Sequence, residues 1–257
     1  MNARAADLAP PLLFGLAVLA LWEAGVRLLG VPTIILPPPS AILLRLVTSG
    51  PTLAADFVQT IQGVLAGFAI GSGAGLLVAI LIDRSPFLQR GLLPLGNFVS
   101  ALPIVGIAPL MVMWFGFDWQ SKAAVVVVMT FFPMLVNATA GLSAAGPIER
   151  DLMKTYAADY GQTLTKLRLP AAAPFVFNAL KINTTLAMIG AIVAEFFGTP
   201  TVGMGFRIST EVGHLSIDMV WATIVVAAVA GSSFYAIVAL IERRATFWHA
   251  SYRTRPN

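Results

Sequence analysis

The clearest chemistry in this chain belongs to Glu195, a carboxylate within the apolar stretch IVAEFFG. Polar groups are costly in such surroundings, and they usually face a bundle interior or a water-filled path. Four other polar residues stand in apolar stretches: Asn97, Ser100, Asn137 and Asn183. We predict that these five residues line or support a path for a solute. A hydrogen bond to a neighbouring helix or loop is the favoured alternative for Glu195, and a helix–helix bond is favoured for the asparagines.

Composition excludes several other kinds of chemistry. Of 257 residues, 58% are hydrophobic and 11% are charged, whereas soluble domains have about a quarter charged residues. The absence of cysteine excludes disulfides and thiolate metal sites, and two histidines are too few for a histidine metal cluster. The sequence contains no basic stripe interleaved with aromatic residues, so it does not indicate nucleic-acid binding. An enzymatic function is disfavoured, because the sequence shows no His/Asp/Ser constellation. The chain therefore reads as an all-α integral membrane protein.

Six segments are long and apolar enough to span a bilayer, which takes about 20 residues. The predicted spans cover approximately 10–30, 57–82, 91–115, 122–145, 172–197 and 217–242, within a single domain of residues 1–257. Pro94, Pro103 and Pro109 interrupt the third. The glycine-rich run GFAIGSGAG at 67–75 lacks the lysine of a phosphate-binding loop, so we interpret it as a surface for close helix packing.

Basic residues orient these spans. With both termini in the cytoplasm, twelve Lys and Arg residues lie inside: Arg4, Arg84, Arg90, Arg150, Lys154, Lys166, Arg168, Lys181, Arg243, Arg244, Arg253 and Arg255. Four lie outside: Arg27, Arg45, Lys122 and Arg207. The positive-inside rule favours this orientation over its inverse. The connection between the fourth and fifth spans is then cytoplasmic.

That connection carries an unusual charged segment, DLMKTYAADYGQTLTKLRLP at 151–170. Good helix formers and the absence of internal proline predict one helix over 148–168, which Pro170 would end. Ala157, Ala158 and Gly161 would let another protein approach closely. A helix resting on anionic lipid is an equally supported alternative.

The same segment resembles the cytoplasmic EAA loop of ABC importer permeases, in which E-A-A is followed by Gly after three residues and ends in I-x-L-P. Counting back from Leu169-Pro170 places Asp151 at the Glu, Leu152 and Met153 at the two Ala, and Ala157 at the Gly. The acid, the small residue and the L-x-L-P ending are kept, and the two alanines are not.

Further stretches are similar to permeases of the nitrate/sulfonate/taurine type, in the order found in that family. They are LPPPSAI at 36–42, ALPIVGIAPLMVMWFGFDWQSK at 101–122, FFPMLVNATAG at 131–141 and AIVAEFFGTPTVGMGFRI at 191–208. The resemblance spans about 35–245. It implies the type I ABC importer permease fold of six transmembrane helices in a bacterial inner membrane, with a coupling helix between helices four and five.

The resemblance also implies partners and roles. A cytoplasmic ABC ATPase dimer would bind ATP and Mg²⁺, a second copy of the permease would complete the path, and a periplasmic or lipid-anchored binding protein would deliver cargo. This chain would itself be non-catalytic, without a cofactor. The residues implied in ATPase coupling are Asp151, Leu152, Met153, Lys154, Tyr156, Ala157, Ala158 and Gly161.

The cargo is less constrained. An anionic cargo would prefer basic residues along its path, and the second to fifth spans offer only Lys181, near the cytoplasmic end. This disfavours a small anion and favours a neutral heterocycle. The form Y-A-A-x-x-x-Q-T…L-R-L-P resembles the branch that imports thiamine-pyrimidine precursors and riboflavin. A nitrate, sulfonate or taurine importer is the alternative. An ion-coupled secondary transporter is a further alternative, disfavoured by the scarcity of intramembrane carboxylates.

Overall fold

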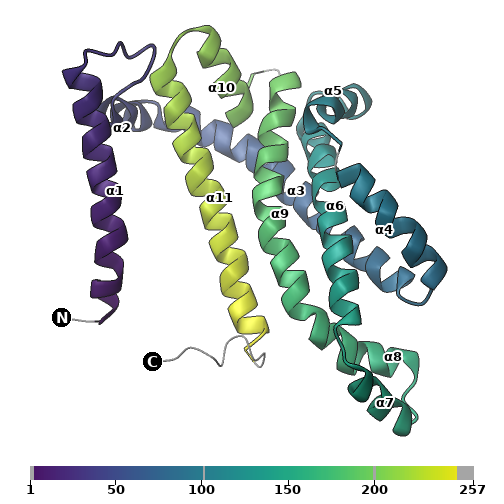
Figure 1. Cartoon of the computed structure of the whole chain (residues 1–257). Coiled ribbons are helices and arrows are strands. Elements are labelled where there is room, and N and C mark those ends of the chain that lie inside the picture. The colour runs from purple at the N-terminus through teal and green to yellow at the C-terminus, as the bar shows by residue number, and fades with distance from the viewer. Residues whose placement is uncertain (1–2, 101, 199–200, 248–257) are drawn as a thin grey trace.

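The computed structural model describes residues 3–100, 102–198 and 201–247, with side chains except at residues 3–8, 86, 93, 95, 97 and 100. Every regular element in these ranges is helical (Figure 1). Five helices are long and apolar enough to cross a membrane: α1 (Ala3–Leu28), α3 (Gly50–Ile82), α6 (Trp119–Ser143), α9 (Leu169–Phe197) and α11 (Ile217–Ala245). These five correspond to the first, second, fourth, fifth and sixth predicted spans, and the all-α membrane fold is confirmed.

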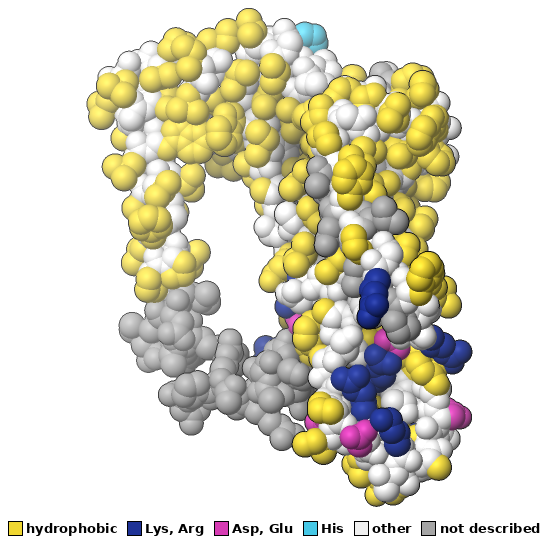
Figure 2. Space-filling model, turned by 45° about the vertical axis from the view of Figure 1, so that its right-hand side comes forward, with side chains coloured by type: hydrophobic (Ala, Val, Ile, Leu, Met, Phe, Trp, Pro, Cys, Tyr) yellow, Lys and Arg dark blue, Asp and Glu magenta, His cyan; other side chains and the backbone are white. Residues whose placement is uncertain are grey.

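Shorter helices gather at the two ends of the long ones. Helices α2 (Pro39–Thr48), α5 (Ile104–Phe115) and α10 (Met204–Gly213) lie at one end, here called the α10 end (Figure 1). Helices α7 (Pro147–Thr155) and α8 (Tyr160–Thr163) lie at the other, the α7 end, together with the start of α1 and the end of α11. Charged side chains gather on the lower part of the visible face, around the α7 end, while apolar side chains cover its upper part (Figure 2).

The bundle centre consists of α3, α6 and α9, and glycine brings α3 against α6. Four glycines recur at every fourth position of α3: Gly63, Gly67, Gly71 and Gly75. A Cβ at Gly67 would lie 2.5 Å from the Cβ of Val126, and one at Gly75 would lie 2.5 Å from the carbonyl oxygen of Phe131. The predicted close packing through small residues is therefore confirmed.

The break predicted within the third span is confirmed at Pro103, whereas Pro94 and Pro109 lie inside helices and do not break them. The residues of this span form α4 (Pro86–Ser100) and α5, and Pro103 stands at the N-cap of α5 with extended backbone angles. Proline pushes the residue before it out of the helical region, so Leu102-Pro103 separates the two helices. Together α4 and α5 return the chain from the end of α3 to the α10 end, where α6 begins (Figure 1).

The single helix predicted over 148–168 is wrong. Helix α7 ends at Thr155, a turn follows, and helical structure resumes at Tyr160 and continues through a π-helical segment, η1 (Leu164–Arg168), into α9. Pro170 does not end the helix, because it lies in the first turn of α9. A wider π turn directly before a proline relieves the clash between its ring and the preceding helical turn, which explains the position of η1.

Candidate coupling and translocation sites

The segment between α6 and α9 presents apolar side chains to solvent. Ile148 and Tyr156 are 82% and 76% exposed, and no residue of α7 is buried. Most of the predicted coupling residues lie on this surface: Asp151, Leu152, Lys154, Tyr156, Ala157 and Gly161 are exposed, while Met153 and Ala158 are partly buried. Lys154 pairs with Asp151 at 2.9 Å within α7. A short amphipathic helix with unpartnered apolar groups is suited to docking against another protein.

A glycine-type turn ends α7. Ala157 has a φ of 51°, in the left-handed region that favours glycine. Its N–H donates to the carbonyl of Lys154 at 2.8 Å, and the N–H of Ala158 donates to the carbonyl of Met153 at 3.0 Å, the two bonds of a Schellman motif. The resemblance places the family's glycine at this position. The left-handed backbone angle explains why glycine is suited to it. After the turn, Asp159 and Gln162 form a capping box that begins α8.

We therefore predict that Ala157→Gly stabilises the protein by about 1 kcal/mol, because glycine adopts a left-handed conformation without the Cβ penalty. Ala158→Gly is the matched control, since Ala158 is not among the residues with positive φ. Thermal unfolding in detergent should show a higher midpoint for the first variant and an unchanged or lower midpoint for the second. Equal midpoints for both variants would contradict a strained turn.

A buried ion pair joins this segment to α3, and sequence reasoning missed it. The guanidinium of Arg168 forks onto Asp83, with Nη1 2.5 Å from Oδ2 and Nη2 2.6 Å from Oδ1. Its Nε donates to the carbonyl of Leu142 at 2.9 Å, and the hydroxyl of Tyr160 donates to Asp83 at 2.9 Å. The Arg84 guanidinium lies 3.9 Å from the centre of the Tyr160 ring. Because 85 residues separate Asp83 from Arg168, no local pattern could have found the pair.

Glu195 lies in a second polar cluster, at the α10 end. It is 2% exposed, and it accepts bonds from the hydroxyl of Thr60 at 2.8 Å and the N–H of Gly205 at 2.7 Å. The hydroxyl of Thr60 accepts in turn from the N–H of Met204 at 2.9 Å. The favoured interpretation of Glu195, a bond to a neighbouring helix or loop, is what the geometry shows.

The same cluster satisfies the free N–H groups at the start of α10. Asp56 accepts from the N–H of Gly203 at 2.9 Å and from Nε of Arg207 at 2.8 Å. This hydrogen bond stabilises the charged guanidinium and raises the pKa of Arg207 above its ordinary value. The carboxylates also lie where the helix dipole is positive. Together with Thr60, they anchor α10 to α3 and α9.

Both glycines of the G-x-G sequence are needed for this anchoring. Gly203 has a φ of 146°, and a Cβ there would lie 2.8 Å from the carboxyl carbon of Glu195. A Cβ at Gly205 would collide with the carbonyl oxygen of Ile192 and lie 2.7 Å from the Cβ of Glu195.

Lys122, which charge counting placed outside, is buried at this end and donates to the carbonyls of Phe117 and Gly198.

The other predicted path residues have separate surroundings. Asn183 is buried, and its Nδ2 donates to Oγ of Ser72 at 2.9 Å and to the carbonyl of Thr130 at 2.8 Å. It therefore bonds α9 to both α3 and α6, as the helix–helix interpretation predicts. Asn137 instead donates to the carbonyl of Pro133 at 2.8 Å, within α6, and among the described side chains it makes no helix–helix bond. The side chains of Asn97 and Ser100 lie outside the described part of the structure.

A stability measurement tests the structural role of Glu195. We expect Glu195→Ala to destabilise the protein by about 2 to 5 kcal/mol, because it leaves the buried N–H of Gly205 without an acceptor and opens a cavity. Glu195→Gln keeps one acceptor oxygen, so it should lose less. Thermal unfolding without cargo should show this order. An alanine variant of unchanged stability, with weakened uptake, would instead indicate direct contact with cargo.

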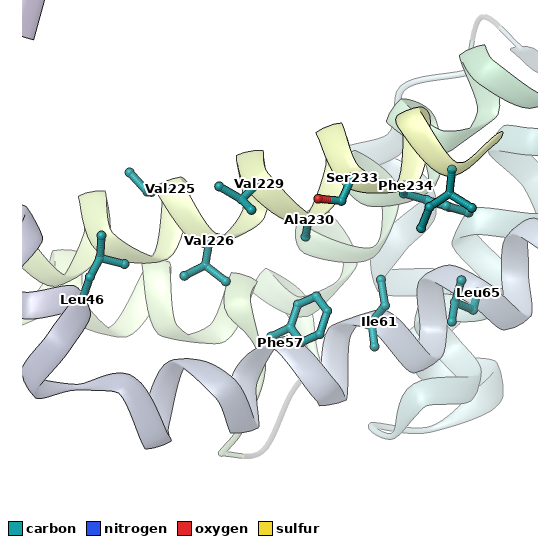
Figure 3. Close-up of a pocket in the computed structure, with 11 residues that line it drawn as sticks. Leu46, Phe57, Ile61, Leu65, Val225, Val226, Val229, Ala230, Ser233 and Phe234 are labelled. Carbon is teal, nitrogen blue, oxygen red and sulfur yellow. The ribbon is translucent and has the colours of Figure 1, made fainter. Parts of the chain in front are cut away.

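An apolar groove of about 650 Å³ lies between α3 and α11 and is open on one side (Figure 3). Its lining consists of Leu46, Phe57, Ile61, Leu65, Val225, Val226, Val229, Ala230, Ser233, Phe234 and Ile237. The hydroxyl of Ser233 is the one side-chain hydrogen-bonding group among them. Such a lining lacks the convergent polar groups that orient a polar ligand.

Comparison with known proteins assigns the family. The family described as binding-protein-dependent transport system inner membrane component matches residues 71–247. The chain belongs to this family. The permease is 29% identical to the formylaminopyrimidine transport permease protein of Halalkalibacterium halodurans over 239 aligned residues. The aligned stretch covers 93% of this chain and 95% of the relative. The permease is 26% identical over 239 residues to the taurine transport system permease protein of Escherichia coli, covering 90% and 86%.

A solved structure supports the same fold. The crystal structure of an amino acid ABC transporter with histidines matches with a TM-score of 0.61 at 17% identity, covering 78% of this permease and 97% of that chain. At this identity the likeness concerns the fold alone. The permease is thus an ABC importer permease of the nitrate/sulfonate/taurine type, a multi-pass inner membrane protein whose family supplies the transport subunit.

Proposed function

We propose that this chain is the permease subunit of an ATP-driven importer, and that Pro147–Arg168 is the segment through which a cytoplasmic ATPase drives it. The observation that carries the proposal is the exposed amphipathic helix α7, which ends in a left-handed turn where the family has glycine. Asp151, Leu152, Met153, Lys154, Tyr156, Ala157, Ala158 and Gly161 are the proposed contact residues. The twelve-to-four distribution of basic residues supports placing the α7 end, and both termini, in the cytoplasm.

The proposed topology has six crossings. Helices α4 and α5 form the third crossing as a broken pair, because they return the chain between the ends of α3 and α6 (Figure 1). A non-helical break within a crossing is tolerated where it lies against protein. Leu102 and Ile104 line a cavity of about 100 Å³ with Val125 and Leu186, on α6 and α9, which supports protein rather than lipid beside the break.

The proposed complex holds two permease subunits, an ATPase dimer that binds ATP and Mg²⁺, and a binding protein on the opposite side. The second permease copy is supported by the sparse packing of α1. Leu12, Leu13, Phe14 and Leu21 of α1 are exposed, and α1 packs on few residues outside α2. Lipid and a second copy are the apolar surroundings available in a membrane.

A neutral heterocycle, such as a thiamine-pyrimidine precursor or a riboflavin-like or aromatic compound, is the proposed cargo. Away from the α10 end, Lys181 is the cation that an anionic cargo would meet in the predicted second to fifth spans. Its Nζ lies 2.7 Å from a carboxylate oxygen of Glu242. That pair neutralises it. The similarity to a formylaminopyrimidine permease supports this cargo class, and the similarity to a taurine permease keeps a sulfonate as the second candidate.

Uptake into right-side-out membrane vesicles tests the proposal. Vesicles containing the permease and its ATPase, loaded with ATP and given binding protein and labelled formylaminopyrimidine, should accumulate the label. Vesicles loaded with a non-hydrolysable ATP analogue should not. Labelled taurine in place of the pyrimidine distinguishes the two cargo classes. Accumulation driven by a proton gradient without ATP would overturn the proposal in favour of an ion-coupled transporter.

A further inference from the structure

We propose that Arg168 and Asp83 form the joint that passes movement of the coupling segment Pro147–Arg168 into the transmembrane bundle. This inference rests on the proposed function, because it needs an ATPase to move the segment. Arg168 would act as a positioning residue: it contacts neither nucleotide nor cargo, and it holds the segment to the end of α3.

Among the described residues, the polar side-chain contacts between the segment and the bundle come from Arg168 and Tyr160. Arg168 binds Asp83 and the carbonyl of Leu142, and Tyr160 binds Asp83 and lies against Arg84. Contacts on Asp83 and Leu142 therefore join the ends of α3 and α6 to the segment. A force applied to α7 therefore reaches α3 through this junction and reaches α9 through the continuous helix from Tyr160 to Phe197.

The chemistry of the pair is suited to a rigid joint. Two parallel N–H···O bonds between a guanidinium and a carboxylate fix orientation as well as distance. The side chains of Arg168 and Asp83 are 14% and 3% exposed, so water does not readily compete for these bonds. Leu164 and Leu169 also pack against the cluster that contains Ala79 and Ile82 of α3. Tilting of the segment therefore displaces α3 with it.

The bundle is built to carry that displacement to the α10 end. The glycine contacts between α3 and α6, the Asn183 bonds across α3, α6 and α9, and the Glu195 cluster connect the three helices along their length. Packed helices with buried polar bonds move as a unit more readily than they deform. Asp83 and the Asp56–Thr60 pair lie towards opposite ends of α3. The joint at one end is thus mechanically continuous with the anchor of α10 at the other.

Two spin labels can measure this transmission separately at each end. The chain contains no cysteine, so Arg150→Cys on α7 and Ser209→Cys on α10 each give a unique label, and both residues are exposed. Distances between equivalent labels in the two permease subunits are measured in the complex with the ATPase, with and without trapped ATP. In the otherwise unchanged protein, both distances should shift on ATP trapping.

Arg168→Ala should keep the shift at residue 150 and lose most of the shift at residue 209. Arg168→Lys keeps the charge without the two-pronged geometry and should give an intermediate shift at 209. The control is Arg45→Ala, which removes an Arg–Asp pair of 3.0 Å between α2 and α11 at the α10 end. It should leave both shifts as they are.

Each outcome decides between the possibilities. A full shift at residue 209 in Arg168→Ala overturns the joint. Loss of ATPase copurification in both Arg168 variants also overturns it, since the pair would then serve only folding or docking. If the unaltered permease shows no shift at residue 150 on ATP trapping, the proposed function itself fails.

Discussion

Gly71→Leu should prevent α3 from packing on α6 and leave the permease largely unfolded. A Cβ at Gly71 would lie 2.8 Å from the carbonyl oxygen of Val127 and 2.9 Å from its Cα, with the hydroxyl of Thr130 closer still. Backbone atoms cannot turn aside as a flexible side chain can. Overpacking in a core typically costs about 1 to 3 kcal/mol, and we expect this substitution to reach or exceed the upper end.

Gly73→Leu is the matched control for this prediction. It places the same side chain two residues further along the same helix, where a Cβ would meet nothing within 4 Å. Size-exclusion profiles in detergent should show a single folded species for Gly73→Leu and aggregated or absent protein for Gly71→Leu. Similar profiles for the two variants would mean that glycine does not set the distance between α3 and α6.

Ala157→Glu should abolish ATP-driven uptake without preventing insertion into the membrane. The substitution places a bulky charged side chain at a left-handed position of the proposed contact surface. An unpaired charge buried in an interface costs about 3 to 5 kcal/mol, which corresponds to a loss of ATPase binding of more than about a hundredfold. Uptake in vesicles and the amount of permease in the membrane are the two measurements.

Ala144→Glu adds the same charge at the same end of the molecule, on an exposed residue at the C-cap of α6 with ordinary helical angles. It should insert and support uptake. Normal uptake by Ala157→Glu would argue strongly against the proposed docking surface. If both variants were inactive, added negative charge at this end, and not the Ala157 position, would be responsible.

The length of the apolar stretches predicted the five long helices well. The glycine-rich run at 67–75 indicated close helix packing, and the structure brings Gly67, Gly71 and Gly75 against α6. Glu195 was singled out because a carboxylate in an apolar stretch must find donors, and Thr60 and Gly205 provide them. These features are decided within one helix or by one costly group, so a single sequence is sufficient to find them.

Breaks within elements were harder to predict. Pro170 looked like a helix end, but the wider turn of η1 accommodates it. Helix α7 instead ends at Thr155, and Ala157, a residue that ordinarily favours helix, takes the left-handed conformation after it. Two hydrogen bonds in the Schellman motif and the capping box that follows outweigh the local propensity. Pro103, in contrast, does separate two helices, since the residue before it cannot remain helical.

Contacts between distant residues were beyond reach. Asp83 and Arg168 each looked like an ordinary charge at the end of a span, and nothing local distinguishes them from Arg84 or Lys166. Their pairing follows from the antiparallel arrangement of α3 with the segment that leads into α9. The same holds for Asp56, which meets Gly203 and Arg207 across about 150 residues of sequence.

The central claim is that this permease receives its work from a separate ATPase, and copurification tests it most directly. Affinity-tagged permease, solubilised in mild detergent from cells that also express the ATPase and the binding protein, should retain the ATPase through size exclusion. The Ala157→Glu permease should lose it, and the Ala144→Glu permease should retain it. An unaltered permease that catalyses uptake in vesicles free of the ATPase would contradict the account.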